Sequence, residues 1–566
     1  MLFIRSAFVK SFPKMSKTTR PSALARTDSD SFCQTLFKKL FTHNMPLYAT
    51  EQYNQNLNIR SYWDLYSYLI FAVVVILQLS NWHKLPLFLD CYYHLSVMRG
   101  FADAGGWVGV SFWDYAPFGR PHLYPPLFHI LELIVFKCGA SPILVAKIFD
   151  LSIYPLFLLC LWFVIRSIYS KETAFFSLLL SISSYPLYLS IVNNIPFTIA
   201  FIFGFLSFYF IKKQKILSAV LALALSLYTH SLMSSLMALS LMFYGFFLSD
   251  DRKTCLWVIF WAILAASPLI FHQLKYMAFI HPLRMMEFYY AQINPFFYIL
   301  AVFGLVLALK KRGEHLFFVA LSIVMLGLLF TNRDRFFSGH GLIPIIFLAA
   351  LFLEHFWKKI SVKQNRRGLF FFWATVIFVF FVLTPIVIIS PLKKYPVFLC
   401  SSWIVPASDS TGGIYAEKGG TFYYPRLIDE AVRIVEQNSS QDDILFSNYN
   451  YGGGIISALA HRATSGAMLL EVLPFRDLGT VKAARFVLWF KDPGGIFPPG
   501  LSDAIGHYGL KKVAETELVY LYVNEGSTFK KKVVRARVPF GVCVLILAGI
   551  LFVIVFDCKN RFLKKK

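Results

Sequence analysis

The chain has 566 residues, of which 57% are hydrophobic and 15% are charged, and its mean hydropathy is +0.58. Soluble proteins carry about 25% charged residues, so this composition excludes an ordinary soluble domain and predicts a polytopic membrane protein. The formal net charge of +24 does not indicate a nucleic-acid partner. The basic residues form short clusters between apolar segments, as the positive-inside rule of membrane proteins expects.

The first 60 residues are polar and basic. They hold nine Lys or Arg residues against three acidic residues. They contain no apolar run followed by a small-residue cleavage site, which a signal peptide would show. We therefore expect residues 1–60 to form a basic tail in the cytosol.

Apolar segments follow one another along the rest of the chain. A helical span requires roughly 17 to 25 apolar residues, and fewer where flanking side chains reach the interface. About twelve segments meet this requirement, which predicts a mainly α-helical transmembrane domain over 61–391 and one more span, with a basic tail, in 533–566. The expected spans are 64–81, 143–165, 173–191, 196–211, 216–231, 233–249, 255–272, 295–309, 316–331, 341–357, 368–390 and 537–556.

Basic clusters between these segments predict the topology. With the N-terminus inside, nearly every short basic loop falls on the inner side. The segment 125–138 is apolar but short, so we place it at the membrane interface; counting it as a span would move most basic loops outside. The last span is basic on both flanks, so its direction rests on the span count. The prediction is a multi-pass plasma membrane protein with both termini in the cytosol. The inner loops are 166–171, 212–215, 251–253, 310–312 and 358–367.

Residues 392–532 differ in composition from the spans, because they contain glycine, proline and most of the clustered acidic residues. Tyr424–Gln437 has the apolar spacing of a helix. Ile444–Phe446, Arg485–Phe490 and Glu517–Val523 have the composition of short strands. About 140 residues is enough for a small α/β domain, and the topology places this domain outside the cell.

The first outer loop, 82–142, is polar and aromatic. Asp90, His94 and Arg99 alternate with apolar residues, as in an amphipathic helix at a membrane interface. The run Gly119–His129 (GRPHLYPPLFH) is too rigid and aromatic for an idle linker. These polar residues could simply be solvated at a membrane surface. An acid just outside a membrane span, however, suits an active site, so Asp90 is the candidate catalytic residue.

This loop resembles the first external loop of the GT-C membrane glycosyltransferases, and most closely that of the oligosaccharyltransferase catalytic subunit. In that family an Asp is followed by two aromatic residues, an Asn or His, an Arg or Lys, and then Y-P-x-G-R and Y-P motifs. The expected spans and external domain extend the resemblance over most of the chain. The matching residues are Asp90, Tyr92, Tyr93, His94, Arg99, Tyr115, Pro117, Gly119, Arg120, Tyr124 and Pro125.

The resemblance implies transfer of a sugar from a polyprenyl phosphate or pyrophosphate. Asp90 would then act as general base or orient the acceptor. By the same resemblance, His94, Arg99, Arg120 and Tyr124 would bind substrate.

Two family motifs are altered in this chain. The family has an acidic pair in the second outer loop that binds a divalent metal, whereas this chain has Asn193 and Asn194. Hard cations prefer carboxylates, so a Mg²⁺ or Mn²⁺ cofactor stays open with Asp90 as its ligand. The amide pair can equally cap and turn a helix end. The family's acceptor motif W-W-D-Y-G is replaced by NYNYG, which leaves Tyr451 as a candidate substrate-binding residue and puts peptide glycosylation in doubt.

An anionic leaving group requires a cation near the outer membrane surface. Arg335, in the outer loop TNRDRFFSGHG, stands where many GT-C proteins have an arginine before a helix. It is the candidate phosphate ligand, and snorkelling to lipid phosphates is the alternative. His230 lies at an outer helix junction, where it could line the site or be structural.

The sequence therefore predicts a GT-C-type membrane glycosyltransferase with a small extracytoplasmic α/β domain. Its expected partners are a polyprenyl-linked sugar, membrane lipids, and a protein, lipid or glycan acceptor on the external face. Two alternatives stay open. One is a transporter or flippase, although no paired, interrupted half-helices stand out. The other is a non-catalytic protein of the same fold that handles glycolipids during assembly of cell-surface polymers.

Overall fold

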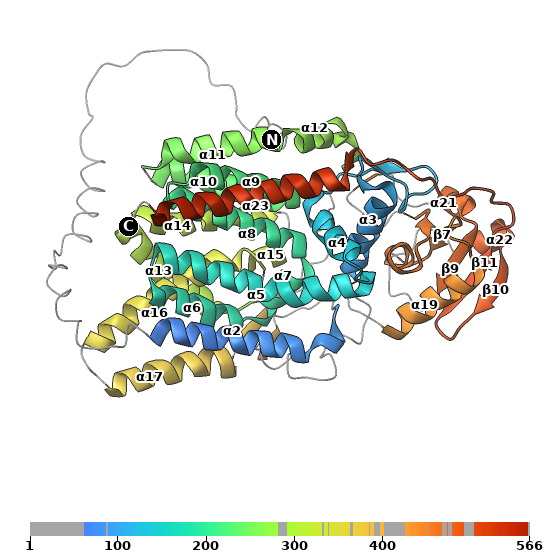
Figure 1. Cartoon of the computed structure of the whole chain (residues 1–566). Coiled ribbons are helices and arrows are strands. Elements are labelled where there is room, and N and C mark those ends of the chain that lie inside the picture. Colours follow the sequence, from blue (N-terminus) through green and yellow to red (C-terminus); the bar gives the residue numbers. More distant parts are fainter. Residues whose placement is uncertain are drawn as a thin grey trace, which may run out of the picture. The chain divides into compact units, whose positions relative to one another are not determined.

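The computed structural model divides into two units, Met1–Arg60 and Ser61–Lys566. The expected basic tail, 1–60, lies outside the described residues. All described helices and strands belong to the second unit (Figure 1). The described residues are 62–86, 89–248, 250–280, 291–330, 333–337, 339–362, 366–383, 385–389, 397–400, 425–449, 451–466, 472–473, 478–491 and 503–563.

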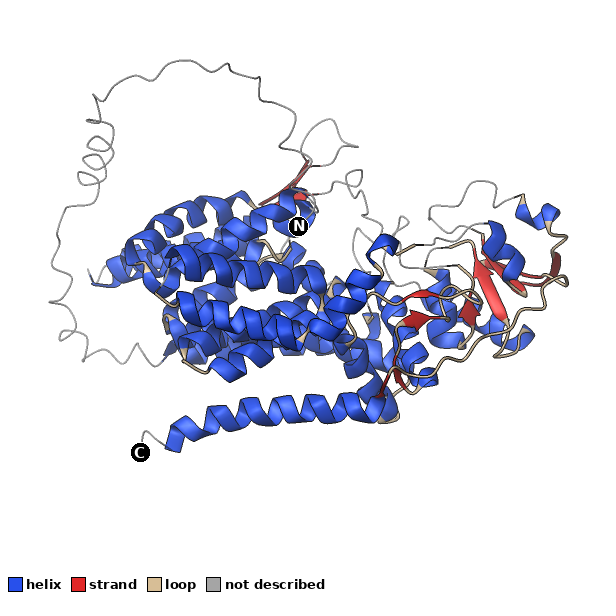
Figure 2. Ribbon diagram, turned by 90° about the horizontal axis from the view of Figure 1, so that it is seen from above, coloured by secondary structure: helices blue, strands red, loops and turns tan. Residues whose placement is uncertain are grey.

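Apolar helices make up most of this unit (Figures 1 and 2). Within the described residues, seven helices are long and apolar enough to cross a membrane, or up to nine if each of two bent pairs counts as one span. Each expected span overlaps a helical segment, but those at 216–231, 233–249 and 295–309 are not among the helices that meet this test, so the count of twelve stays a prediction. The helices are α2 (Tyr62–Ser80), α5 (Pro142–Ile168), α6 (Lys171–Ile182), α7 (Tyr185–Asn193), α8 (Ile195–Lys212), α9 (Ile216–Thr229), α10 (Ser231–Phe243), α11 (Arg252–Ala265), α12 (Ser267–Lys275), α13 (Pro295–Lys311), α14 (Leu316–Met325), α15 (Arg333–Phe337), α16 (Leu342–Val362), α17 (Arg366–Ile377) and α23 (Phe540–Leu563).

Two expected spans are bent. The segment expected at 173–191 breaks between α6 and α7 with an angle of 84°, and that at 255–272 breaks between α11 and α12 with an angle of 62°. Pro186 and Pro268 lie in the first turns of α7 and α12. A proline at that position starts a helix readily but cannot continue the preceding one, which accounts for both bends.

The span expected at 368–390 ends earlier than predicted. Helix α17 continues as a π-helix to Leu383, and Pro385–Ile389 then forms strand β5. Strand β5 pairs antiparallel with β4 (Ala291–Ile293) and β6 (Val397–Cys400). Pro385 and the β-branched residues that follow it favour the change from helix to strand.

The basic loops meet at one end of the helices. Lys212 pairs with Asp251 at 2.7 Å, and Lys213 donates to the Ser167 carbonyl at 3.0 Å. These contacts agree with the expectation that the basic clusters share one side of the membrane. Other contacts at this end join Asp64 to Arg166 and Lys171, Glu354 to Thr173 and Lys358, and Tyr169 to Glu314.

A five-stranded sheet forms the centre of the C-terminal region, with strand order β10-β11-β9-β7-β8. Strand β7 is parallel to β8 and β9, whereas β9, β11 and β10 are antiparallel neighbours. The helix and three strands expected here are confirmed to within about two residues, whereas the boundaries 392–532 stay a prediction. The elements are α19 (Pro425–Asn438), β7 (Ile444–Ser447), α20 (Gly452–Ile455), β8 (Ala463–Thr464), α21 (Leu478–Ala483), β9 (Phe486–Phe490), α22 (Ala504–His507), β10 (Lys511–Glu515) and β11 (Val519–Val523).

Helix α3 (Asp90–Ala104) is buried between the apolar helices and the sheet region. Its residues Leu95 and Phe101 are fully buried in the same core as Ile456 and Leu488. Beside α3 lies α4 (Leu127–Lys137), which has 11 residues and is too short to span a bilayer. This length agrees with the interfacial placement expected for 125–138.

The last helix is attached at both ends. Before α23, strand β12 (Val538–Pro539) pairs antiparallel with β1 (Gly106–Trp107) of the first outer loop. A Cβ on Gly106, whose φ is 151°, would lie 2.2 Å from the Val538 carbonyl, so only glycine allows this approach. At the other end, Asp557 accepts hydrogen bonds from Ser218 at 2.5 Å and Lys215 at 3.0 Å. Relative to the other helices, α23 therefore runs in the direction that the span count predicts.

A polar clasp joins α3 to the sheet region and to the segment before α23. Asp103 lies 2.8 Å from the His461 ring and forms an ion pair with Lys531 at 2.5 Å. Burial acts to raise the pKa of Asp103, but the hydrogen bonds from His461 and Lys531 outweigh it and hold the pKa below its ordinary value. A carboxyl with a depressed pKa stabilises the fold above its unfolded pKa of about 4, and this contribution is lost as the pH falls through the folded value.

We expect Asp103→Asn to loosen this clasp at neutral pH, because a neutral amide attracts Lys531 far less. Hydrogen exchange of residues 524–537 should accelerate roughly fivefold or more, which corresponds to about 1 kcal/mol. Wild-type protein should show the same acceleration only below about pH 4. The exposed Asp503→Asn is the matched control. Equal exchange in both variants would contradict the clasp.

Candidate active site

The candidate site begins at the first turn of α3. Asp90 is the first residue of this helix and is half-buried. An acidic side chain is stabilised there by the helix dipole. His94 follows one turn later, so the two side chains lie on the same face of α3.

His94 is packed among aromatic rings. Its Nδ1 lies 3.0 Å from Nε2 of His129, a fully buried residue of α4. Its ring centroid lies 5.4 Å from that of Tyr124 and 5.1 Å from that of Phe128. Burial lowers the pKa of His94 to about 3, so the ring is neutral at physiological pH.

Tyr124 connects this face of α3 to the ends of the membrane helices. Its ring centroid lies 5.9 Å from that of His230, which stands between α9 and α10. His230 packs on Phe197 with a centroid distance of 4.9 Å. The guanidinium of Arg335 lies 5.0 Å from the same Phe197 ring and donates to Asn194 Oδ1 at 2.9 Å.

The structure thus brings together four of the predicted site residues, His94, Tyr124, His230 and Arg335, beside the helix that begins at Asp90. They come from the first outer loop, the junction of α9 and α10, and α15. Asn194, at the junction of α7 and α8, completes the group.

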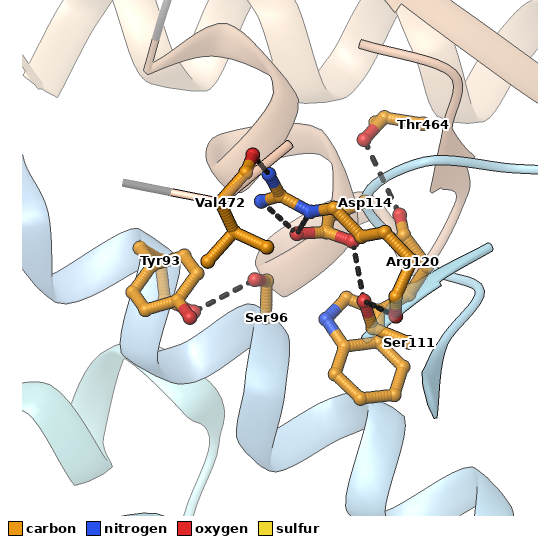
Figure 3. A network of polar contacts seen from close by, with 8 residues as sticks. Tyr93, Ser96, Ser111, Asp114, Arg120, Thr464 and Val472 are labelled. Atoms are coloured by element: carbon orange, nitrogen blue, oxygen red, sulfur yellow. Dashed lines mark hydrogen bonds and ion pairs between the residues drawn. The ribbon is translucent and has the colours of Figure 1, made fainter. Parts of the chain in front are cut away.

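Arg120 has a different environment. It is 3% exposed and pairs with Asp114 at 2.6 Å, while its Nη1 donates to the Val472 carbonyl at 2.8 Å. Figure 3 shows this guanidinium between Asp114 and Val472, with Ser111 donating to Asp114 at 2.8 Å. These contacts lock the first outer loop onto the C-terminal region. The predicted role of Arg120 in substrate binding stays a prediction.

Arg99 and Tyr451 lie where α3 meets the sheet region. Arg99 donates to the Ala458 carbonyl at 3.2 Å, and its guanidinium lies 4.9 Å from the Phe136 ring centroid. Tyr451 precedes α20, and its ring centroid is 5.6 Å from that of Tyr449. Arg99 contributes to holding the two regions together, and the predicted substrate-binding roles of both residues stay predictions.

His129 and Thr198 belong to this group in the structure but were not predicted from the sequence. His129 contacts His94, although its only signal was its place in the aromatic run after Gly119. Thr198 Oγ1 lies 2.8 Å from Nε2 of the fully buried His340. No spacing rule relates residue 94 to 129 or 198 to 340, because these pairs form through tertiary packing.

Two buried carboxyl groups lie near the start of α3. Glu132 and Asp150 are each 2% exposed, and both act electrostatically on Cys91, next to Asp90. Burial and the charge of Asp150 raise the pKa of Glu132 well above its ordinary value. Burial therefore disfavours the charged form of Glu132, which is the form in which a carboxyl binds a metal ion.

The residues at this group do not fit a Mg²⁺ or Mn²⁺ ion. Arg335 donates to Asn194 Oδ1 and places a positive charge where the family's acidic pair would hold a cation. Two amides and a single Asp90 also supply fewer carboxylate oxygens than hard cations prefer. Across the described ranges, no group of three or more His, Cys, Asp or Glu side chains is arranged to hold a metal ion.

No protein-family model matches the chain, and no curated protein matches its sequence. Solved structures do match. The apo oligosaccharyltransferase of Archaeoglobus fulgidus gives a TM-score of 0.54 at 11% identity, covering 83% of this chain and 76% of that one. AglB of the same archaeon, in complex with an inhibitory peptide and a dolichol-phosphate, gives 0.50 at 12% identity, covering 82% and 75%. ArnT from Cupriavidus metallidurans gives 0.49 at 12% identity, covering 81% and 97%.

The chain has the fold of the GT-C membrane glycosyltransferases. The particular likeness is to the archaeal oligosaccharyltransferase AglB, as the first outer loop indicated. At 11–12% identity this likeness concerns the fold alone.

Replacing Asp114 should destabilise the protein, because Asp114→Ala leaves the Arg120 guanidinium buried without its carboxylate. Removing one partner of a buried ion pair costs about 3–5 kcal/mol. We expect a large fall in the thermal unfolding temperature in detergent. The double variant Asp114→Leu/Arg120→Leu should recover part of this loss, because it leaves no unpaired charge. A single variant as stable as wild type would show that the pair is not needed.

Proposed function

We propose that this chain is a GT-C-type glycosyltransferase that moves a sugar from a polyprenyl phosphate or pyrophosphate to an acceptor on the external face of the plasma membrane. One observation carries the proposal. His94, Tyr124, His230 and Arg335, from segments far apart in sequence, gather beside the helix that begins at Asp90.

Arg335 suits the leaving group. Its guanidinium is planar, permanently charged and able to bind two phosphate oxygens at once. The neighbouring His94 and His230 are half-buried, and desolvation lowers the pKa of each ring to about 3, so they favour their neutral forms and do not compete with Arg335 for the phosphate charge. As the bond between the sugar and the phosphate breaks, negative charge develops on phosphate oxygen, and Arg335 would stabilise it.

Asp90 is suited to act on the acceptor, the group that attacks the sugar. Its carboxylate would take the proton of the acceptor group as that group attacks the anomeric carbon. His94, on the same face of α3, would contact the acceptor. No step requires a metal, because the developing charge is met by Arg335.

We propose that the acceptor is not the asparagine of a peptide sequon. Where the family has its tryptophan-containing motif, Asn448 uses its side chain to exchange two hydrogen bonds with the backbone of Phe490, at 2.9 and 2.7 Å. This side chain is fully buried. Asn448 is therefore not available to read a sequon, and we take a hydroxyl of a lipid, glycan or protein as the acceptor group.

The function is tested with purified protein in lipid nanodiscs and a panel of polyprenyl-phosphate and polyprenyl-pyrophosphate sugars. Mass spectrometry follows donor consumption. We expect Asp90→Asn to lose turnover at least a hundredfold, because the amide cannot accept a proton. Arg335→Gln should also slow turnover. The exposed Asp429→Asn should leave it unchanged.

Thermal unfolding of each variant separates loss of chemistry from loss of fold. If no donor is consumed, or if Asp90→Asn equals wild type while both are folded, the transferase proposal fails. A glycolipid carrier or scaffold would then explain the fold better.

Chelation should have little effect. EDTA is expected to change donor turnover by less than twofold, and added Mg²⁺ or Mn²⁺ should not raise it, because the positive charge of Arg335 lies at the amide pair. Turnover that is abolished by EDTA and restored by Mn²⁺ would show instead that Asp90 holds a metal with ligands other than Asn194.

A further inference from the structure

Helix α12 packs against the first outer loop with one of its faces. It follows the 62° bend after α11, and its Leu269 and His272 are buried, whereas Phe271 and Leu274 are exposed. Residues three apart on a helix lie on the same side, so the buried pair defines one face and the exposed pair another. The buried face is the one from which α12 contacts the loop.

Two consecutive residues of α12 bind two consecutive carbonyls of the first outer loop. His272 Nε2 lies 3.0 Å from the His122 carbonyl oxygen, and Gln273 Nε2 donates to the Leu123 carbonyl at 2.9 Å. Because a carbonyl only accepts, the amide nitrogen of Gln273, and not its oxygen, must face Leu123. The backbone that leads into Tyr124 is therefore held by α12.

The second hydrogen of the Gln273 amide is used at the start of α10. Gln273 Nε2 also donates to Ser231 Oγ, which lies 2.9 Å away. Ser231 directly follows His230, and Leu123 directly precedes Tyr124. An amide NH₂ group has two hydrogens, so these two bonds use its full donor capacity. Gln273 thus joins the backbone next to Tyr124 to the side chain next to His230.

The two rings beside this bridge are in contact and belong to different sides of the candidate site. The ring centroids of Tyr124 and His230 lie 5.9 Å apart at an interplanar angle of 86°. Tyr124 packs on His94, which faces the acceptor in the proposed reaction. His230 packs on Phe197, the ring that also contacts the Arg335 guanidinium. The contact between the two rings therefore connects the acceptor side to the phosphate side.

We propose that Gln273 is a positioning residue that fixes the spacing between Tyr124 and His230 and thereby aligns the acceptor with the sugar donor. This inference rests on the proposed function, because the two sides are those of the transfer reaction. Gln273 acts through its two hydrogen-bond partners and not on the reacting atoms. Alignment of two bound reactants lowers the barrier of the chemical step more than it strengthens the binding of either one.

The kinetic test uses the nanodisc assay with the polyprenyl-linked sugar that wild type consumes. Gln273→Met keeps an unbranched side chain of similar length but has no hydrogen to donate. Its kcat should fall about tenfold, while KM for the donor stays within about twofold of the wild-type value. Gln273→Lys should restore most of kcat, because an ammonium group carries three donors. The exposed Gln437→Met is the matched control and should behave as wild type.

A spectroscopic test reports the spacing without turnover. A fluorotyrosine is placed at position 124, and its ¹⁹F signal is recorded in nanodiscs. The ring current of His230 shifts this signal, so His230→Leu gives the value for a Tyr124 ring without that neighbour. Gln273→Met should move the signal toward the His230→Leu value. Gln273→Lys and Gln437→Met should leave it near the wild-type value.

Ser231→Ala tests the bridge from the α10 side. It removes one of the two bonds of Gln273, so its loss of kcat should be smaller than that of Gln273→Met. The double variant should lose no more than Gln273→Met alone, because both changes remove the same hydrogen bond. If Gln273→Met does not fold, Ser231→Ala replaces it in both tests. Additive losses would show that the two residues act independently, which contradicts the bridge.

Two further results would overturn the inference. One is a fluorine signal and a kcat that Gln273→Met leaves unchanged. The other is an equal loss of kcat in the Met and Lys variants when thermal unfolding shows both to be folded. Failure of the proposed function is distinguishable, because Asp90-dependent donor consumption is then absent while the fluorine signal still reports the spacing.

Discussion

In a bilayer every backbone polar group must be satisfied within the protein, so a spanning segment is helical and its side chains are mainly apolar. Chemistry must therefore be placed where helices begin, end or bend. Each residue of the candidate site obeys this constraint. Asp90 opens α3, Asn194 separates α7 from α8, His230 separates α9 from α10, and Arg335 lies in the short α15.

Helix α3 has two functions in the fold. One part of its surface carries Asp90 and His94 toward the site, and another packs into the core shared with the sheet region. Arg99 and Asp103 add polar contacts to that region. Helix α3 therefore carries the candidate site on one face and packs against the C-terminal region with another. Buried Arg120 reinforces this packing from the first outer loop.

Much of this arrangement could be predicted from the sequence. The rest depends on tertiary contacts, which local sequence does not determine. Apolar length identified the helical segments, strand-like composition identified β7, β9 and β11, and helical spacing identified α19. The resemblance of the first outer loop identified His94 and Tyr124, and the arginine expected before a helix in the loop TNRDRFFSGHG identified Arg335, although not which of these polar residues would gather. Arg120 and Arg99 were predicted to bind substrate on the same grounds. Local sequence does not reveal that the Arg120 guanidinium pairs with Asp114, or that the Arg99 guanidinium donates to the Ala458 carbonyl. The pairing of His94 with His129 depends on the packing of two helices, which spacing does not encode.

The pairing of β1 with β12 bears on how the protein is made. Gly106 contacts Pro539, about 430 residues further along the chain, so this strand pair has a very long sequence separation. During synthesis the first outer loop emerges long before its partner strand exists. Until the ribosome has added the last helix, the loop that carries Asp90 lacks one of its edges. The newly made helical domain therefore stays incomplete at this end until residues 538–539 have been synthesised and can pair with the first outer loop.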